Sequence, residues 1–162
     1  MNKQLDEVRS HEVAQGIKGK AKKTFDNAYR AALATEGANY VQGFVVFSGQ
    51  PYRPVEHAWI ELNDTAGEES VIRIIDPNLP HLKKTGDDLW YFAAQSLSVK
   101  ELKEILEESE EDYPEDDPLP IYGNAPYEYY GDVMLGDKKY LDAYQLAEAK
   151  CKEINKPIVE SN

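Results

Sequence analysis

Apolar residues change their spacing along the chain, and these changes predict where helices give way to strands. From residue 22 to about residue 36 the apolar side chains recur every three or four residues, the period of an amphipathic helix, at Phe25, Ala28, Tyr29, Ala32 and Leu33. Residues 40–47 are instead β-branched and aromatic, and Ser48, Gly49 and Pro51 then favour a turn. We therefore expect a first helix that leads directly into a strand.

Two further strand patterns follow. Residues 56–62 alternate strictly, so that their apolar side chains share the face expected to meet the core and His57 lies on the opposite face. Residues 70–76 form the next run, and Pro77 stops it because proline cannot donate a backbone hydrogen bond. Three successive strands joined by turns predict an antiparallel meander.

The second half of the chain predicts two more helices. Ser98 and Glu101 have the spacing of a capping box, so a helix is expected to begin there. The acidic, proline-containing run 107–118 predicts a loop, because like charges and prolines oppose regular structure. Asp137 then opens a last helix that reaches to about residue 155.

These elements together predict an α+β protein with one domain over residues 22–155. Its antiparallel sheet is expected to pack against the N-terminal helix and the C-terminal helices. Residues 1–21 have no firm period and predict a mobile N-terminal arm, and residues 156–162 predict a C-terminal tail.

Charge and cysteine content narrow the expected partners and location. The 30 acidic and 18 basic residues give a net charge of −12, which repels phosphates and anionic membranes, so neither nucleic acid nor a membrane is expected as a partner. This charge fits solubility, and it also fits attraction to a basic protein surface.

Cys151 is the single cysteine, which excludes an internal disulfide. The first residues lack the apolar core of a signal peptide, and no apolar run approaches the ~20 residues that span a bilayer, so we expect a cytoplasmic protein.

Five short segments carry a family resemblance. They are Thr24-Phe25-Asp26-Asn27-Ala28, Tyr40-Val41-Gln42-Gly43-Phe44, Glu56-His57-Ala58-Trp59, Ile75-Asp76-Pro77 and Trp90-Tyr91-Phe92. Across residues 22–105 the chain resembles small bacterial and phage-encoded proteins of the papain-like hydrolase superfamily, of the cell-wall-amidase-like branch. The resemblance implies a papain-like fold. It also implies a site built from a cysteine at the start of the first helix, a strand histidine and a following acidic or polar residue.

The chemistry of such a site explains why each residue type is needed. The helix N-terminus lowers the pKa of the thiol, the histidine accepts its proton, and the third group orients the imidazole. The matching positions here hold Thr24, His57 and Asp76, so an alcohol stands where the relatives carry a thiol. An alcohol has a far higher pKa, and an internal threonine lacks the N-terminal amine that activates known threonine nucleophiles. Thr24 also suits the role of a helix N-cap, so we expect catalysis to be absent.

Other kinds of chemistry have less support. His11, His57 and His81 form no helical pair, and the acidic run lacks the order of an EF-hand, so no metal is expected. No glycine-rich phosphate loop occurs, so no cofactor is expected either. Cys151 is expected to be buried and inert. Several late tyrosines suit either a partner surface or ordinary packing, namely Tyr122, Tyr127, Tyr129, Tyr130, Tyr140 and Tyr144.

Three hypotheses of function therefore remain open. The first is a degenerate papain-like domain that binds a protein or peptide-like partner without turning it over. The second is a weak amidase, peptidase or acyl transferase in which Thr24 attacks, His57 is the base and Asp76 orients it. The third is an acidic inhibitor or interaction protein whose loop 107–118 and tyrosine-rich segment bind a basic partner. The oligomeric state is left open by the sequence.

Overall fold

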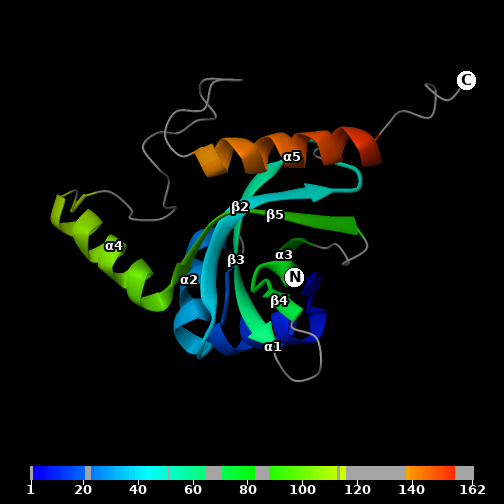
Figure 1. Ribbon diagram of the computed structural model, residues 1–162. Helices are drawn as coiled ribbons and strands as arrows, with labels where there is room; N and C mark the ends of the chain where they lie inside the picture. The colour runs from blue at the N-terminus through cyan, green and yellow to red at the C-terminus, as the bar shows by residue number, and fades with distance from the viewer. Residues whose placement is uncertain are drawn as a thin grey trace, which may run out of the picture. The chain divides into compact units, whose positions relative to one another are not determined.

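The protein has an α+β fold. The computed structural model describes residues 2–20, 23–50, 52–64, 71–82, 88–112, 114–115 and 138–155. Within these ranges the chain forms five strands and five helices (Figure 1). In chain order they are β1 (Asn2–Leu5), α1 (Glu7–Ile17), α2 (Thr24–Ala34), β2 (Asn39–Phe47), β3 (Val55–Asp64), β4 (Val71–Ile75), α3 (Leu79–Leu82), β5 (Leu89–Ser98), α4 (Val99–Asp112) and α5 (Lys138–Ile154).

The five strands form one mixed sheet in the order β1-β4-β3-β2-β5. β3 and β4 pair antiparallel with Ile60 opposite Ile75, as the meander predicts. β1 pairs with β4 in parallel, with Leu5 opposite Ile74. The predicted α+β class is therefore confirmed, but the prediction of a purely antiparallel sheet is wrong. The sequence does not reveal the parallel strand β1, because a strand of four residues is too short to show a period.

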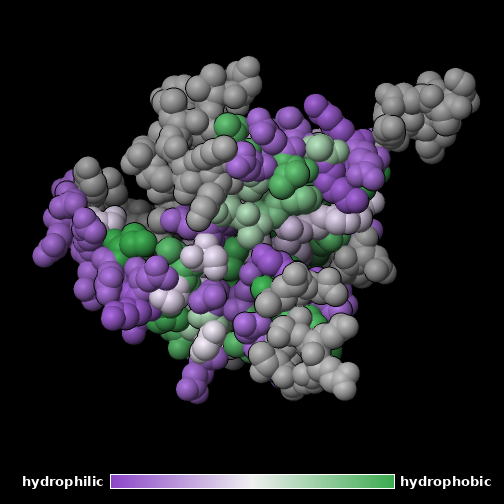
Figure 2. Space-filling view, viewed as in Figure 1, coloured by the Kyte–Doolittle hydropathy of each residue, from purple (hydrophilic) through white to green (hydrophobic). Residues whose placement is uncertain are grey.

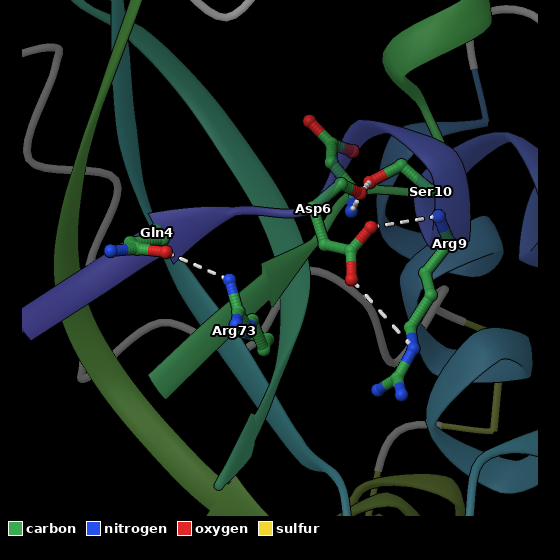
Figure 3. A network of polar contacts seen from close by, with 6 residues as sticks. Gln4, Asp6, Arg9, Ser10 and Arg73 are labelled. Atoms are coloured by element: carbon green, nitrogen blue, oxygen red, sulfur yellow. Dashed lines mark hydrogen bonds and ion pairs between the residues drawn. The ribbon is translucent and has the colours of Figure 1, made fainter. Parts of the chain in front are cut away.

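The N-terminal segment forms β1 and α1 where the sequence predicts an arm. Asp6 caps α1 by accepting a hydrogen bond from Arg9 N at 3.0 Å, as Figure 3 shows. The side chain of Gln4 on β1 accepts from Arg73 on β4 at 2.8 Å. The buried face of α1 consists of Ser10, Ala14 and Ile17. A serine and an alanine give a weak amphipathic pattern, which is why the sequence does not reveal this helix.

The chain divides into two compact units. The first comprises Met1–Gln42, Ala58–Lys84 and Ser96–Ile121, and the second comprises Gly43–His57, Thr85–Gln95 and Tyr122–Asn162. The boundaries of the single domain predicted from the sequence stay a prediction.

The core of the first unit packs α2 against the sheet. Ala28, Ala31 and Ala32 are at most 1% exposed, and their small side chains let the helix approach Tyr40 and Ile60 closely. Leu97 at the end of β5 and two leucines of α4, Leu102 and Leu106, join the same cluster. The amphipathic pattern of the first predicted helix is thus confirmed as a core-facing stripe.

The core of the second unit packs α5 against β2 and β5 (Figure 1). The helix contributes Ala143, Ala147 and Cys151, and the strands contribute Phe44, Val46 and Ala94. Tyr144 packs edge-on against Phe44 with ring centroids 5.4 Å apart. Burial, followed by the charge of Glu148, raises the pKa of Tyr144 above its usual range.

The prediction that Cys151 is buried is confirmed. Tyr122, Tyr127, Tyr129 and Tyr130 lie outside the described residues, as does the side chain of Tyr140.

α4 continues through half of the predicted acidic loop. The capping box at its start is confirmed, since Ser98 N donates to Glu101 Oε1 at 3.0 Å and Glu101 N donates to Ser98 Oγ at 3.2 Å. Residues 107–112 are helical rather than irregular, because Leu102 and Leu106 anchor the apolar side of the helix in the core. Residues 113 and 116–118 of the run lie outside the described residues. In the part of the chain that the structure describes, no helix has the length and apolar character needed to cross a membrane.

Candidate functional site

Thr24 is the first residue of α2, but it is not the N-cap. Lys23 occupies the cap position and makes no side-chain capping bond, so the prediction of Thr24 as the cap is wrong. The side chain of Asn27, one turn into the helix, instead holds the preceding segment. Its Oδ1 accepts from Lys20 N at 3.2 Å and its Nδ2 donates to Lys20 O at 2.7 Å. Asn27, a residue inside α2, therefore holds the segment that precedes the helix. Capping residues are normally sought before the first helical residue, so the sequence does not reveal this role.

Asp76 directly follows β4 and is completely buried. Its backbone N donates to Ser10 Oγ at 2.8 Å, and Ser10 Oγ in turn donates to the Asp6 carbonyl at 2.7 Å. Asp76 Oδ1 accepts from Asn78 N at 2.8 Å, which closes an Asx turn over Pro77. One carboxylate oxygen of the predicted site residue is therefore engaged in holding its own turn.

Asn78 connects this turn to two other elements. Its Nδ2 donates to the Thr24 carbonyl at 3.1 Å and to the Ala58 carbonyl at 3.2 Å. Its Oδ1 accepts from Asn27 Nδ2 at 2.9 Å. Because Asn78 is 3% exposed, these bonds form with little competition from water. The structure thus brings the Thr24 backbone and the Asp76 turn together through a third residue.

His57 lies on β3 in the second unit, whereas Thr24 and Asp76 belong to the first. It is 2% exposed, and its ring centroid is 6.3 Å from that of Tyr91 at an angle of 54°. The joint arrangement of Thr24, His57 and Asp76 stays a prediction.

The predicted polar face of β3 is buried together with its apolar face. Trp59 is fully buried and its Nε1 donates to Glu61 Oε2 at 2.9 Å. Lys3 Nζ, from β1, lies 3.2 Å from the same oxygen and neutralises a carboxylate that is 7% exposed. Alternation in the sequence correctly separates the two faces, but it does not show that both are covered.

Three residues of the buried polar network were missed by sequence reasoning. Ser10, Asn27 and Asn78 are each at most 3% exposed. Serine and asparagine are normally residues of surfaces, caps and turns, so no sequence pattern marks them as buried. Only the order Asp76-Pro77-Asn78 held a usable indication, since it is typical of a tight turn.

The exposed face of α4 is rich in glutamate, and Figure 2 shows a hydrophilic surface over this helix. A shallow concavity of about 560 Å³ is lined by Glu104, Glu107, Glu108, Glu110 and Glu111. The last turn of α4 carries no basic residue, although cations are favoured at a helix C-terminus. Among the described residues, no group of three or more histidine, cysteine, aspartate or glutamate side chains is placed to hold a metal ion.

Comparisons of the chain with protein-family models, with curated proteins and with solved structures find no match.

Proposed function

We propose that this protein is a papain-like domain that has lost catalysis and acts by binding a protein or peptide-like partner. The observation that carries the proposal is the alcohol at the start of α2: Thr24 is the first helical residue, where a hydrolase of this type would hold its thiol. A single, buried, free cysteine elsewhere is consistent with a cytoplasmic location.

The hydrogen bonds around Thr24 and Asp76 support a structural rather than a catalytic use of these residues. The Thr24 carbonyl and the Asp76 Oδ1 atom both bond to Asn78. A helix dipole stabilises a neighbouring thiolate, but the pKa of an alcohol is too high for the same effect to produce an alkoxide near neutral pH. The remaining scaffold can still present a surface to a partner.

The test measures hydrolysis of a pool of fluorogenic peptide amides by the full chain. We expect no turnover above background in the wild type and in Thr24→Ala. Turnover by the wild type that disappears in Thr24→Ala or His57→Ala, with unchanged circular dichroism, would overturn the proposal in favour of an enzyme using Thr24, His57 and Asp76.

A second arm tests the papain-like ancestry. In a Cys151→Ser background, Thr24→Cys places a thiol at the helix start, and we expect it to react with iodoacetamide at a lower pH than a free cysteine does. A matched thiol at the exposed position Glu12→Cys, in the middle of α1, should react as a free cysteine. Equal pH profiles for the two thiols would argue against the ancestry.

A second candidate function is favoured by the exposed acidic face of α4, which suits a basic protein partner. Its test uses a lysine homopeptide as the probe. We expect binding that weakens as salt is raised and that is lost when Glu104, Glu107, Glu108 and Glu111 are all changed to glutamine. If neither the raised salt concentration nor the four substitutions weakens binding, the acidic face of α4 is not the binding surface.

A further inference from the structure

The acidic end of α4, residues 107–112, carries no buried side chain. The buried residues of the helix are Leu102 and Leu106, and both join the core of the first unit. Beyond Leu106 every residue of α4 is exposed except Ser109, which is half-buried. Helices in proteins are stabilised mainly by the packing of an apolar face, so the acidic end receives little of that stabilisation.

The side chains of this segment also repel one another. Residues three or four apart are neighbours on a helix, and like charges at that spacing destabilise it. Acidic residues repeat at this spacing along α4, at Glu104, Glu107, Glu108, Glu110, Glu111 and Asp112. The helix dipole further disfavours negative charge at a C-terminus, and the last turn of α4 has no basic residue. Local electrostatics therefore favours fraying of the acidic end.

Little compensates for this repulsion among the described residues. The basic residues of α4, Lys100 and Lys103, lie in its first half. Lys103 precedes Glu107 by four residues, which is the less favourable order for a pair of opposite charges. The ion pairs that described residues form involve none of the six acidic side chains. The glutamates line an open concavity, so dissolved ions can reach them.

We propose that the acidic end of α4 is a charge-dependent helical segment. At low ionic strength its carboxylates repel one another, and the segment frays from its C-terminus. Salt, or a basic partner that covers the same carboxylates, screens the repulsion and completes the helix. The salt response is a property of the free chain and goes beyond the proposed function, whereas completion of the helix by a partner rests on the second candidate function.

Hydrogen exchange of the full chain tests the salt response. It is measured in sodium chloride at about 0.01 M and about 1 M, where the Debye lengths are about 30 Å and about 3 Å. A triple variant, Glu107→Gln with Glu108→Gln and Glu111→Gln, removes repelling charges and keeps nearly the same helix propensity. The matched control combines Glu12→Gln, Glu36→Gln and Asp142→Asn, which change the net charge equally at exposed positions outside α4.

We expect the amides of residues 107–112 to be protected about tenfold more at high salt than at low salt, and those of residues 102–106 to change by less than about twofold. The triple variant should show the higher protection at both salt concentrations, and the control should respond as the wild type does. Protection of residues 107–112 that does not change with salt, or an equal gain of protection in the control at low salt, would overturn the inference.

A lysine homopeptide at low salt is the basic probe for the second arm. We expect the homopeptide to raise the protection of residues 107–112 as salt does, because it neutralises the same carboxylates. A homopeptide that binds to the acidic face without raising this protection would overturn the inference. If the homopeptide does not bind, the second candidate function fails while the salt response of the free chain still decides the inference, so the two failures are distinguishable.

Discussion

The Asn78 side-chain amide donates to the Thr24 carbonyl across 3.1 Å, and this bond ties the start of α2 to the turn that follows β4. The same nitrogen donates to Ala58 on β3, so one buried side chain joins a helix, a strand and a turn. This hydrogen bond holds the backbone of Thr24 beside the turn that contains Asp76. It therefore makes Asn78 a central residue of the first unit.

Asn78→Ala is expected to destabilise the protein by about 3 kcal/mol, because it removes several buried hydrogen bonds and leaves carbonyl groups without their donor. The free energy of unfolding in urea measures the effect. Asn63→Ala, at an exposed position of β3, is the matched control and should change stability by no more than about 0.5 kcal/mol. Similar values for the two variants would contradict the role of Asn78.

Ser10→Ala tests whether α1 is an integral part of the fold. It removes the hydroxyl that accepts from the buried Asp76 N, and an unpaired buried donor costs about 1–3 kcal/mol. Chemical denaturation of Ser10→Ala and of Gln15→Ala, an exposed position on the same helix, gives the comparison. A mobile arm would predict no loss in either variant.

Two glycines are expected to respond to alanine with opposite signs. A Cβ on Gly43 would lie 2.0 Å from the Phe92 carbonyl oxygen and 2.9 Å from Ala94 N, both of them backbone atoms, so Gly43→Ala should cost about 3 kcal/mol or more. Gly16, near the end of α1, has no neighbour within 4 Å of such a Cβ, so Gly16→Ala should stabilise by about 1 kcal/mol. Thermal denaturation of both variants measures the two shifts. A tolerated alanine at position 43 would show that β2 and β5 are not packed so closely.

Glu101 should make the stability of α4 depend on acid pH. The hydrogen bond from Ser98 N, followed by that with the Ser98 side chain, lowers the pKa of Glu101 below its ordinary value. A lowered pKa in the folded state gives stability that is present above the ordinary pKa and is lost as the pH falls through the lowered value. The stability difference between wild type and Glu101→Gln should therefore be largest near neutral pH and shrink in acid, as urea denaturation at a series of pH values will measure. Glu104→Gln, without a capping bond, should show no such trend.

The parts of the fold that the sequence predicts are those whose pattern repeats over several turns or residues. α2, β2, β3 and β4 follow from apolar periodicity, and the capping box locates the start of α4. β1 and α1 escape prediction, since four residues show no period and the inner face of α1 includes Ser10. The acidic end of α4 is helical because Leu102 and Leu106 hold the helix on the core, against the local preference of its charges.

The residues of the candidate site also differ in whether the sequence reveals them. The sequence marks Thr24, His57 and Asp76 by their residue types and context. It does not mark Asn78, Ser10 or Asn27, whose importance comes from burial and from partners distant in the chain. The pairing of Lys3 with Glu61 is equally hidden, because 57 intervening residues separate its members.

The sequence by itself determined the periods of α2, β2, β3 and β4, the acidic charge and the alcohol at position 24, because these depend on residue type and on neighbours along the chain. Only the tertiary structure decided that β1 joins the sheet in parallel, that both faces of β3 are buried, and that Asn78 holds the start of α2. Those outcomes depend on which groups lose contact with water. A buried polar group must find its hydrogen-bond partner wherever the fold brings one, and local sequence does not specify that location.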